Sequence, residues 1–354
     1  MNSTLKNLIN KQKLEELKNA IEGKVDDRWE NEKPILIIDF WNLFIRNFAT
    51  LKFIDPATNL HVGGIFGSLQ SLKYLVKLTF PDEIYVAYEG KDSSKRRKDI
   101  NENYKKGRKK VNPFKEGEYD EDPSENMYRQ LKTLKEFFDY LPFIQLEQPK
   151  LEADDIIAFL CKKNPNRKKI IVSSDKDFYQ LLDENTRIFE PIQKRFITEQ
   201  TILDKFGIHP KNFCLARTFD GDKSDNVDGL EGVGLKTVLK LFPFISENKR
   251  YSLEYLTNHA IEKLKEKKPK GMKKYELVIK EDSQKTLYDN FKIMDLFEDR
   301  PIMNEVNLME FIKYKKEEVH YDPTNLRMLF IEHGANKQLS QMYDWDRAFT
   351  RFQG

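Results

Sequence analysis

Cysteine is scarce in this chain, which has only Cys161 and Cys214 in 354 residues, and neither belongs to a Cys-x-x-Cys pair or a cysteine–histidine cluster. A disulfide framework and a structural zinc site both need several such side chains at short spacings, so the sequence disfavours both. Two isolated thiols are usual in a reducing compartment, and a cytoplasmic location is therefore expected.

Long apolar runs are missing as well. No stretch approaches the roughly 20 apolar residues that cross a bilayer, and the N-terminus has no apolar run. We therefore expect a soluble, intracellular protein with no membrane partner. Charge of one sign is not in excess either, because 61 Lys and Arg offset 58 Asp and Glu to give a net charge of +3. A near-neutral total can conceal a strongly patterned surface, so local charge is more informative.

Three short apolar runs each end in acidic residues: 35–40 (ILIIDF), 83–90 (EIYVAYEG) and 168–177 (KKIIVSSDKD). Continuous apolar runs of this length predict buried parallel strands. Helical patterns lie between them, at about residues 62–79, 124–140 and 152–163. Strands that alternate with helices predict an α/β fold with a mainly parallel central sheet and flanking helices.

The rest of the chain divides by pattern. Residues 186–197 predict a hairpin at the sheet edge, and the pattern is helical from about 198 to 300. Four parts are expected: a polar N-terminal extension with a short amphipathic-helix pattern (1–33), an α/β core (34–200), a helical region (201–300) and a C-terminal helical segment (301–354).

Acidic residues are concentrated in five segments of the chain. They are Asp39; Glu89; Glu152, Asp154 and Asp155; Asp175 and Asp177; and Asp222 and Asp225. Any one of them alone is more often an ordinary surface acid. Parallel strands, however, deliver their carboxyl ends to one edge of the sheet, where α/β proteins place their sites. Carboxylates gathered there would repel one another unless cations neutralised them.

Oxygen ligands without His or Cys favour Mg²⁺ or Mn²⁺ over zinc. Two such ions can stabilise both the attacking and the leaving oxygen in phosphodiester cleavage, so no serine or cysteine nucleophile is needed. One acid has a structural alternative: Asp155 lies in the first turn of the predicted helix at 152–163, where the helix dipole favours a negative charge.

A basic segment follows Glu89 directly. Residues 91–110 hold ten Lys or Arg against three acids. Such a run is usually a solvated face, but beside a metal site it would bind the scissile phosphate, and Tyr104 could stack on a base. Residues 229–242 (GLEGVGLKTVLKLF) predict a helix–hairpin–helix element whose glycine amides and helix start would bind phosphate without reading base sequence.

In this order, the motifs IIDF, AYEG, SKRRKDINENYKKGR, LEADD, SSDKDFYQL and GDKSDNVDGLEGVGLKT resemble the 5′-nuclease superfamily of flap endonucleases and 5′–3′ exonucleases. The stretches YDNFKIMDLFEDRPI and LRMLFIEHGANKQLSQMY are similar to the T-even-type bacteriophage members, the ribonuclease H group of this family. The resemblance covers roughly residues 34–340. It implies a PIN-like catalytic core (34–200), a helical arch (91–123) and a helix–three-turn–helix element (221–243) that grips duplex DNA.

The resemblance also implies roles for individual residues. The catalytic metal cluster would use Asp39, Glu89, Glu152, Asp154 and Asp175, with Glu89 standing where the family usually has Asp. The second ion would use Asp177, Asp222 and Asp225, with Asp155 as an auxiliary acid. Lys95, Arg96 and Arg97 match the catalytic basic residues at the base of the arch. Nucleic acid would be bound by Tyr104, Lys105, Lys106, Arg108, Gly232, Gly234 and Lys236.

The function implied is a structure-specific 5′–3′ exonuclease and flap endonuclease that uses two Mg²⁺ ions, with Mn²⁺ as a substitute and K⁺ at the hairpin. Its substrates would be DNA and RNA–DNA hybrids with free 5′ ends or flaps, from which it would remove RNA primers and flaps during replication. A monomer is expected, with a single-strand-binding protein or a sliding clamp as partner, in the host cytoplasm if a phage encodes the chain.

Two alternatives stay open at this point. A PIN-type ribonuclease shares the acidic sheet edge but needs neither the basic segment nor the hairpin. A catalytically inactive, structure-specific DNA-binding protein would gain nothing from so many mutually repelling acids beside DNA. The tail 338–345 (QLSQMYDW) suggests a clamp-binding peptide only faintly, and a final helix that packs its aromatic residues is the favoured interpretation.

Overall fold

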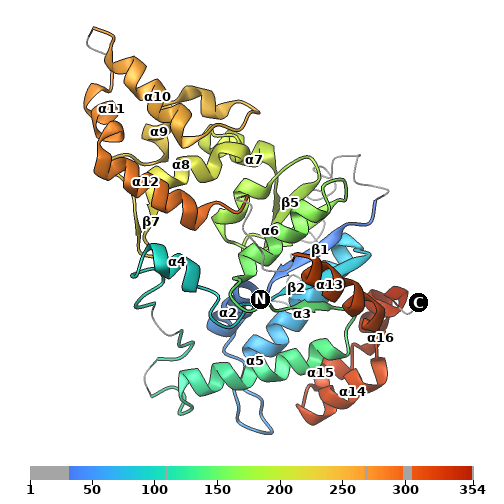
Figure 1. Ribbon diagram of the computed structural model, residues 1–354. Coiled ribbons are helices and arrows are strands. Elements are labelled where there is room, and N and C mark those ends of the chain that lie inside the picture. Colours follow the sequence, from blue (N-terminus) through green and yellow to red (C-terminus); the bar gives the residue numbers. More distant parts are fainter. Residues whose placement is uncertain (1–31, 109–110, 116, 268–269, 298–304, 353–354) are drawn as a thin grey trace, which may run out of the picture.

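The computed structural model describes residues 32–108, 111–115, 117–267, 270–297 and 305–352, and it is built around one six-stranded sheet (Figure 1). Almost all of the polar N-terminal extension, whose leucine spacing suits a short amphipathic helix, lies outside the described residues. None of the described helices is long and apolar enough to cross a membrane.

The sheet has the strand order β3-β2-β1-β4-β5-β6. Its strands are β1 (Ile35–Asp39), β2 (Glu83–Ala87), β3 (Ile144–Leu146), β4 (Lys169–Val172), β5 (Thr186–Glu190) and β6 (Arg195–Ile197). All neighbouring pairs are parallel except β5 and β6, which form an antiparallel hairpin at the edge. The α/β prediction, the three acid-ending strands and the edge hairpin are confirmed. Sequence reasoning missed β3, which is only three residues long.

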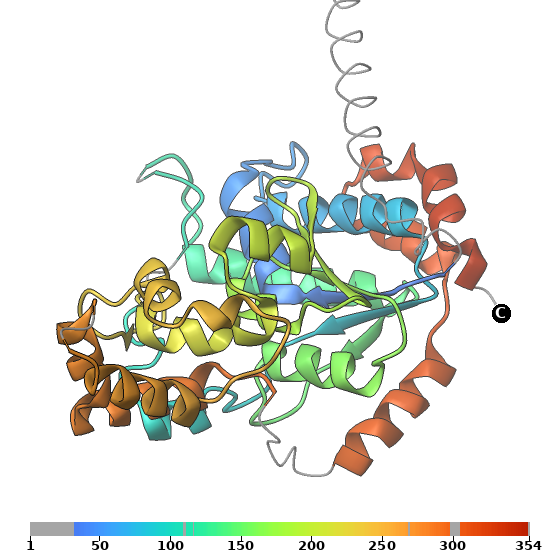
Figure 2. The same cartoon turned by 90° about the horizontal axis from the view of Figure 1, so that it is seen from above.

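Alternate residues of the central strand β1 enter two separate hydrophobic cores. Ile35 and Ile37 pack on the face covered by α6 (Ala153–Lys163). Leu36 and Ile38 pack on the opposite face, with α3 (Gly63–Thr79) and α5 (Pro123–Asp139). Figure 2 shows α3 and α6 on opposite sides of the sheet. Burial of both faces explains why the strands are apolar throughout, without the alternation of a half-exposed strand.

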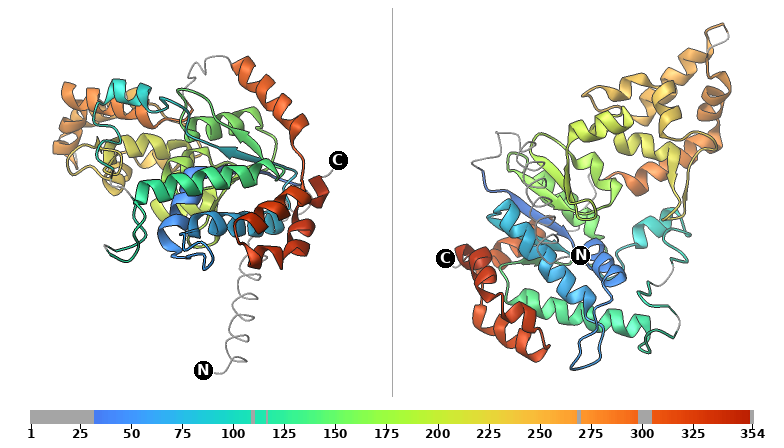
Figure 3. Two further views of the ribbon diagram at one scale, coloured as in Figure 1. Left: turned by 90° about the horizontal axis from the view of Figure 1, so that it is seen from below. Right: turned by 180° about the vertical axis from the view of Figure 1, so that it is seen from behind.

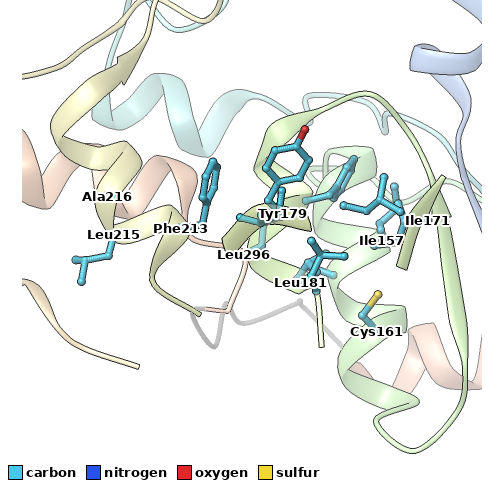
Figure 4. Close-up of a cluster of buried hydrophobic side chains, with 14 of the residues drawn as sticks. Ile157, Cys161, Ile171, Tyr179, Leu181, Phe213, Leu215, Ala216 and Leu296 are labelled. Carbon is cyan, nitrogen blue, oxygen red and sulfur yellow. The ribbon is translucent and has the colours of Figure 1, made fainter. Parts of the chain in front are cut away.

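The helical region extends away from one end of the sheet (Figure 1). It contains α7 (Glu199–Phe206), α8 (Phe213–Asp220), α9 (Leu235–Leu241), α10 (Leu253–Leu264), α11 (Met272–Ile279) and α12 (Glu281–Met294). Its core is continuous with the α6 core, because Phe213 and Leu215 belong to the same buried cluster as Ile157 and Ile171 (Figure 4). The helical region is therefore held firmly against the sheet and can position side chains at its edge.

The C-terminal helices lie on the other side of the molecule from the helical region, the first of them against β3 and the last against α3 (Figure 3). They are α13 (Glu305–Glu318), α14 (Pro323–Glu332), α15 (Asn336–Leu339) and α16 (Met342–Phe349). Trp345 is fully buried, with the Lys73 ammonium 5.0 Å from its ring centre, and Phe349 is buried with it. The prediction of a final helix that packs its aromatic residues is thus confirmed. Within the tail at 338–345, Tyr343 stays exposed.

Candidate active site

The carboxyl ends of β1, β2 and β4 open onto a pocket of about 640 Å³. Seven of the nine predicted metal-binding acids line it: Asp39, Glu89, Glu152, Asp154, Asp175, Asp177 and Asp225. Asp222 lines a small adjoining cavity together with Asp177 and Asp225. Asp155 lies behind the pocket, where it is 5% exposed. The structure therefore brings acids from five distant segments to one edge of the sheet.

Two of the acids are oriented by the helix starts that follow their strands. Asp39 accepts a hydrogen bond from the backbone N–H of Asn42, at the start of α2 (Phe40–Thr50), at 3.2 Å. The hydroxyl of Ser173 donates to the other oxygen of Asp39 at 2.9 Å. Asp175 accepts from the backbone N–H of Asp177 at 2.8 Å, at the start of the 3₁₀ helix η2 (Lys176–Leu181). Each carboxylate thus satisfies an orphan amide of a helix end and is fixed in direction by it.

A close backbone crossing brings Glu89 next to Glu152. The backbone N–H of Gly90 donates to the carbonyl of Leu151 at 3.0 Å. A Cβ at position 90 would lie 1.7 Å from the carbonyl oxygen of Gln148, so only glycine fits. This crossing aligns the end of β2 with the start of α6, and it delivers two carboxylates to the same pocket.

Arg97 lies beneath the carboxylates and not at the surface. Its side chain, in α4 (Lys95–Ile100), is 1% exposed. The guanidinium lies 3.1 Å from Glu152, 2.9 Å from Asp154 and 3.1 Å from Asp155. Its Nε donates to the carbonyl of Ile293 at the end of α12. Arg97 therefore compensates buried negative charge and connects α4, α6 and α12 at one point.

The other two residues predicted at the base of the arch lie nearer the surface. Lys95 is exposed, and Arg96 is half-buried and donates to the carbonyl of Lys292 at 3.1 Å. Asp155 accepts a hydrogen bond from the backbone N–H of Glu152 at 3.1 Å and so caps the start of α6. This is a structural role in the first turn of the helix, the alternative to metal binding that was considered for this acid. Because Asp155 also pairs with Arg97 and does not line the pocket, it is an auxiliary acid that helps to hold the site together.

The basic segment folds back onto the acids. Lys105 donates to Glu152 at 2.6 Å, and Arg108 pairs with Asp225. Tyr104 is only 3% exposed and its hydroxyl donates to Glu152 at 3.2 Å. The ring is thus packed inside, which corrects the expectation that it is presented to a base for stacking. Lys106 is exposed.

Sequence reasoning missed two residues that hold this arrangement together. Asn226 donates through its side chain to the carbonyls of Asn103 and Lys106, so it locks the basic segment to the GDKSDN loop. Arg217 of α8 lies 3.2 Å from Asp177 and 2.5 Å from Asp222. Asn226 closes the GDKSDN motif, which was singled out for its acids alone, and Arg217 belongs to no charge run, so the contacts of both appear only in the fold.

The acids are hard to ionise in this environment. Burial raises the pKa of Asp39 and of Glu89 to about 7, and that of Asp177 to about 8. The nearby charge of Asp175 contributes, after burial, to the raised pKa of both Asp39 and Asp177. Against the effect of burial, hydrogen bonds from Ser224 and the pairing with Arg217 hold the pKa of Asp222 below its ordinary value. The cluster is therefore short of positive charge.

The donor set fits hard divalent cations. Among the residues that the structure describes, the buried Oε1 of Glu152 has no hydrogen-bond partner, although Oε2 of the same carboxylate is paired with Arg97 and Lys105. As the described side chains stand, no three acidic, histidine or cysteine groups converge closely enough to enclose an ion. Arg97, Lys105 and Arg217 instead pair with them. An incoming cation would thus compete with these pairs for carboxylate oxygens.

These pKa shifts predict a pH-dependent effect of Mg²⁺ on stability. Between about pH 4 and about pH 8 the folded, metal-free protein keeps protons on Asp39, Glu89 and Asp177 that the unfolded chain releases, so these groups lower its stability as the pH rises. Mg²⁺ needs the ionised form, so the increase in melting temperature on adding Mg²⁺ will be larger at about pH 8 than at about pH 6. The Asp177→Asn variant will show a smaller difference between the two pH values. An equal Mg²⁺ effect at both would contradict this prediction.

The predicted hairpin is present between α8 and α9. Gly232 has a φ of +67°, a conformation that favours glycine, and Val233 is buried beneath the turn. Gly234 precedes α9, and Lys236 is exposed on that helix. The resemblance implies K⁺ at this hairpin. The ammonium of Lys274 donates to the carbonyl of Glu231 at 3.0 Å, so the chain already supplies a cation to the turn.

Comparison with known proteins identifies the family. Residues 34–207 match the family described as the 5′-3′ exonuclease, N-terminal resolvase-like domain. The 5′-3′ exonuclease of Aquifex aeolicus is 32% identical over 212 residues, which is 59% of this chain and 68% of the relative. This chain belongs to the 5′-3′ exonuclease family. The matched region contains every predicted acid except Asp222 and Asp225, and it also contains the basic segment.

Other relatives set the extent of the likeness. The thermostable DNA polymerase I of Thermus thermophilus is 32% identical over 215 residues, but this chain spans only 24% of its length. Among solved structures, the bacteriophage T5 D15 flap endonuclease in a pseudo-enzyme-product complex with DNA and metal ions aligns with a TM-score of 0.62. The alignment covers 80% of this chain and 98% of that one, at 19% identity. The structural likeness to the T5 D15 protein establishes that this chain has the fold of a 5′ nuclease.

Proposed function

We propose that this member of the 5′-3′ exonuclease family is a Mg²⁺-dependent, structure-specific 5′–3′ exonuclease and flap endonuclease. Its substrates would be DNA and RNA–DNA hybrids with free 5′ ends or flaps, and its task the removal of RNA primers and flaps in replication. One observation carries the proposal: seven carboxylates share a pocket with the basic residues Lys105 and Arg108.

The carboxylates would hold two divalent ions. Asp39, Glu89, Glu152, Asp154 and Asp175 would serve the first ion, and Asp177, Asp222 and Asp225 the second. Mg²⁺ or Mn²⁺ suits this all-oxygen donor set, and such ions stabilise the charge on the attacking and leaving oxygens of phosphodiester hydrolysis. A solved relative supports metal binding as such, since the T5 D15 protein has been co-crystallised with metal ions.

The basic residues would act on the phosphate. Lys105 and Arg108 line the pocket, so their charges lie in the space that a scissile phosphate must enter. They would attract the phosphate and stabilise negative charge as it develops there. Lys95 and Arg96, at the start of α4, would contact the strand on its way in. Arg97 is a positioning residue in this proposal, because it is buried among the acids and orients them.

The expected partners follow from the same reasoning. Duplex DNA with a 5′ flap would lie against the hairpin, while its single-stranded 5′ end reached the pocket. The T5 D15 relative was solved with DNA, which supports a nucleic-acid substrate. A single-strand-binding protein or a sliding clamp, and the monomeric state, are further expectations from the family resemblance.

The experiment compares three 5′-labelled substrates with the full chain, with and without Mg²⁺: a 5′-flap duplex, a nicked RNA–DNA hybrid and single-stranded RNA. The proposal predicts release of short 5′ products from the first two, only with Mg²⁺, and at least tenfold slower cleavage of the third. Preferential cleavage of single-stranded RNA would point to a PIN-type ribonuclease instead. Tight binding without cleavage in Mg²⁺ or Mn²⁺ would point to an inactive DNA-binding protein.

A further inference from the structure

A lysine-rich stretch at residues 261–275 lies outside the pocket and the hairpin motif. It spans the end of α10 and the start of α11, at the far end of the helical region (Figure 1). Two of its lysines are neutralised by nearby acids around the end of α10: Lys263 lies 2.7 Å from Glu266, and Lys265 lies 2.6 Å from Glu262. The lysines nearer α11 differ from these in their surroundings.

One of them, Lys274, reaches the hairpin. Its ammonium donates to the carbonyl of Glu231 at 3.0 Å. A Cβ added to Gly232 would lie only 2.6 Å from the same ammonium, so the charge lies directly against the turn. Two further contacts fix this arrangement. The hydroxyl of Tyr275 donates to the carbonyl of Leu241 at 2.9 Å, and Gly271 packs against the Leu241 side chain. α11 is therefore held against the end of α9.

The hairpin itself has the wrong charge for phosphate. Residues 228–234 (DGLEGVG) contain two exposed acids, Asp228 and Glu231, and no Lys or Arg. A phosphate that approached the turn amides would meet this negative charge. Lys274 supplies a cation at that point from a segment distant in the sequence. Lys270 and Lys273 lie within four residues of it in the sequence, are exposed, and have no acidic ion-pair partner among the residues that the structure describes.

The exposed face of α9 continues this basic surface. Lys236 and Lys240 are four residues apart in the helix and are both exposed, so they lie on one face. Because Tyr275 and Gly271 hold α11 against Leu241 at the end of α9, the two sets of lysines belong to neighbouring elements. A nucleic-acid backbone is the partner that a row of uncompensated ammonium groups fits, since each group can neutralise one phosphate.

We propose that Lys274, with Lys270 and Lys273 beside it, forms a second phosphate-binding segment of the hairpin, which contacts the duplex backbone where the motif alone would repel it. This deepens the proposed function and rests on it for the identity of the duplex. The contacts would be sequence-independent, because they are made to phosphates and not to base edges.

The test measures binding of the full chain to a blunt DNA duplex in EDTA, where no cleavage occurs, over a series of salt concentrations. The plot of log K against log salt has a negative slope, and each lost phosphate contact makes it shallower by about 0.9. Lys274→Met will therefore reduce the steepness of this slope by about one. The Lys270→Met/Lys273→Met/Lys274→Met variant will lower the slope by two to three times as much, and Lys274→Arg will keep the wild-type slope. The matched control is Lys265→Met, which removes the same charge from a lysine already paired with Glu262 and will leave the slope nearly unchanged.

An unchanged slope in Lys274→Met would overturn the proposal, and so would an equal decrease in Lys265→Met. Thermal unfolding of each variant identifies a merely structural role, in which Lys274→Met loses stability but keeps the wild-type slope once folded. This outcome too would overturn the proposal. The binding assay involves no catalysis, so its result is independent of cleavage. If the wild type failed to cut any substrate while the Lys274 effect held, the proposed nuclease function would fail and this inference would stand.

Discussion

Replacement of both Asp175 and Asp177 by asparagine will lower Mg²⁺-dependent cleavage of a 5′-flap duplex by about 10³-fold or more, equivalent to ~4 kcal/mol of transition-state free energy. Both side chains line the pocket beyond β4, and each belongs to a different proposed ion. Asparagine keeps the size and one oxygen but removes the charge that holds a divalent cation. Single-turnover rates at saturating enzyme measure the effect separately from binding.

Duplex binding in EDTA serves as the second readout for that variant. The hairpin and its lysines lie outside the pocket, so affinity should stay within a few-fold of the wild type, or rise as negative charge is removed. Glu184→Gln is the matched control, because Glu184 is an exposed acid that follows η2 and does not line the pocket. Wild-type cleavage by the double variant would remove these acids from the mechanism.

Replacement of Arg97 by methionine will lower the free energy of unfolding of the metal-free protein by about 3–5 kcal/mol, the usual cost of removing one partner from a buried ion pair. The side chain is 1% exposed and is the shared partner of Glu152, Asp154 and Asp155. Its loss would leave these carboxylates without their buried cation. Urea denaturation in EDTA measures the change, and saturating Mg²⁺ should restore part of it.

Arg167→Met is the comparison for this second prediction. Arg167 also pairs with two acids, Asp82 and Glu83, but its side chain is 35% exposed. Solvent screens such a pair, so the loss should be about 1 kcal/mol or less. Similar losses in the two variants would mean that Arg97 does not carry the buried charge of the site.

The acids could be predicted from the sequence because their positions follow from a simple rule. Apolar runs that end in Asp39, Glu89 and Asp175 become parallel strands, and parallel strands share one carboxyl edge. The hairpin could also be predicted from the sequence, because Gly232 and Gly234 flank Val233, which is buried, just before a helix. In both cases the signal is local, and the fold only brings the segments together.

The compensating cations could not be predicted in the same way. Arg97 looks like any other residue of a basic run, and its burial depends on where α6 and α12 place their ends. Arg217 is distant in sequence from Asp177, and Lys274 is distant from the carbonyl of Glu231. Tyr104 was expected to stack on a base, but the packing of the basic segment against Glu152 turns its ring inward. Each of these depends on tertiary contacts that no periodicity encodes.

The most direct test of the central claim is a Mn²⁺ titration of the metal-free protein, followed by the electron paramagnetic resonance signal of free Mn²⁺. An acidic sheet edge that serves as a divalent-metal site predicts removal of about two Mn²⁺ per chain at about pH 8, displacement of the bound Mn²⁺ by Mg²⁺, and loss of that binding in the Asp175→Asn/Asp177→Asn variant. Mn²⁺ binding that is absent, or that is identical in the wild type and the variant, would contradict the account.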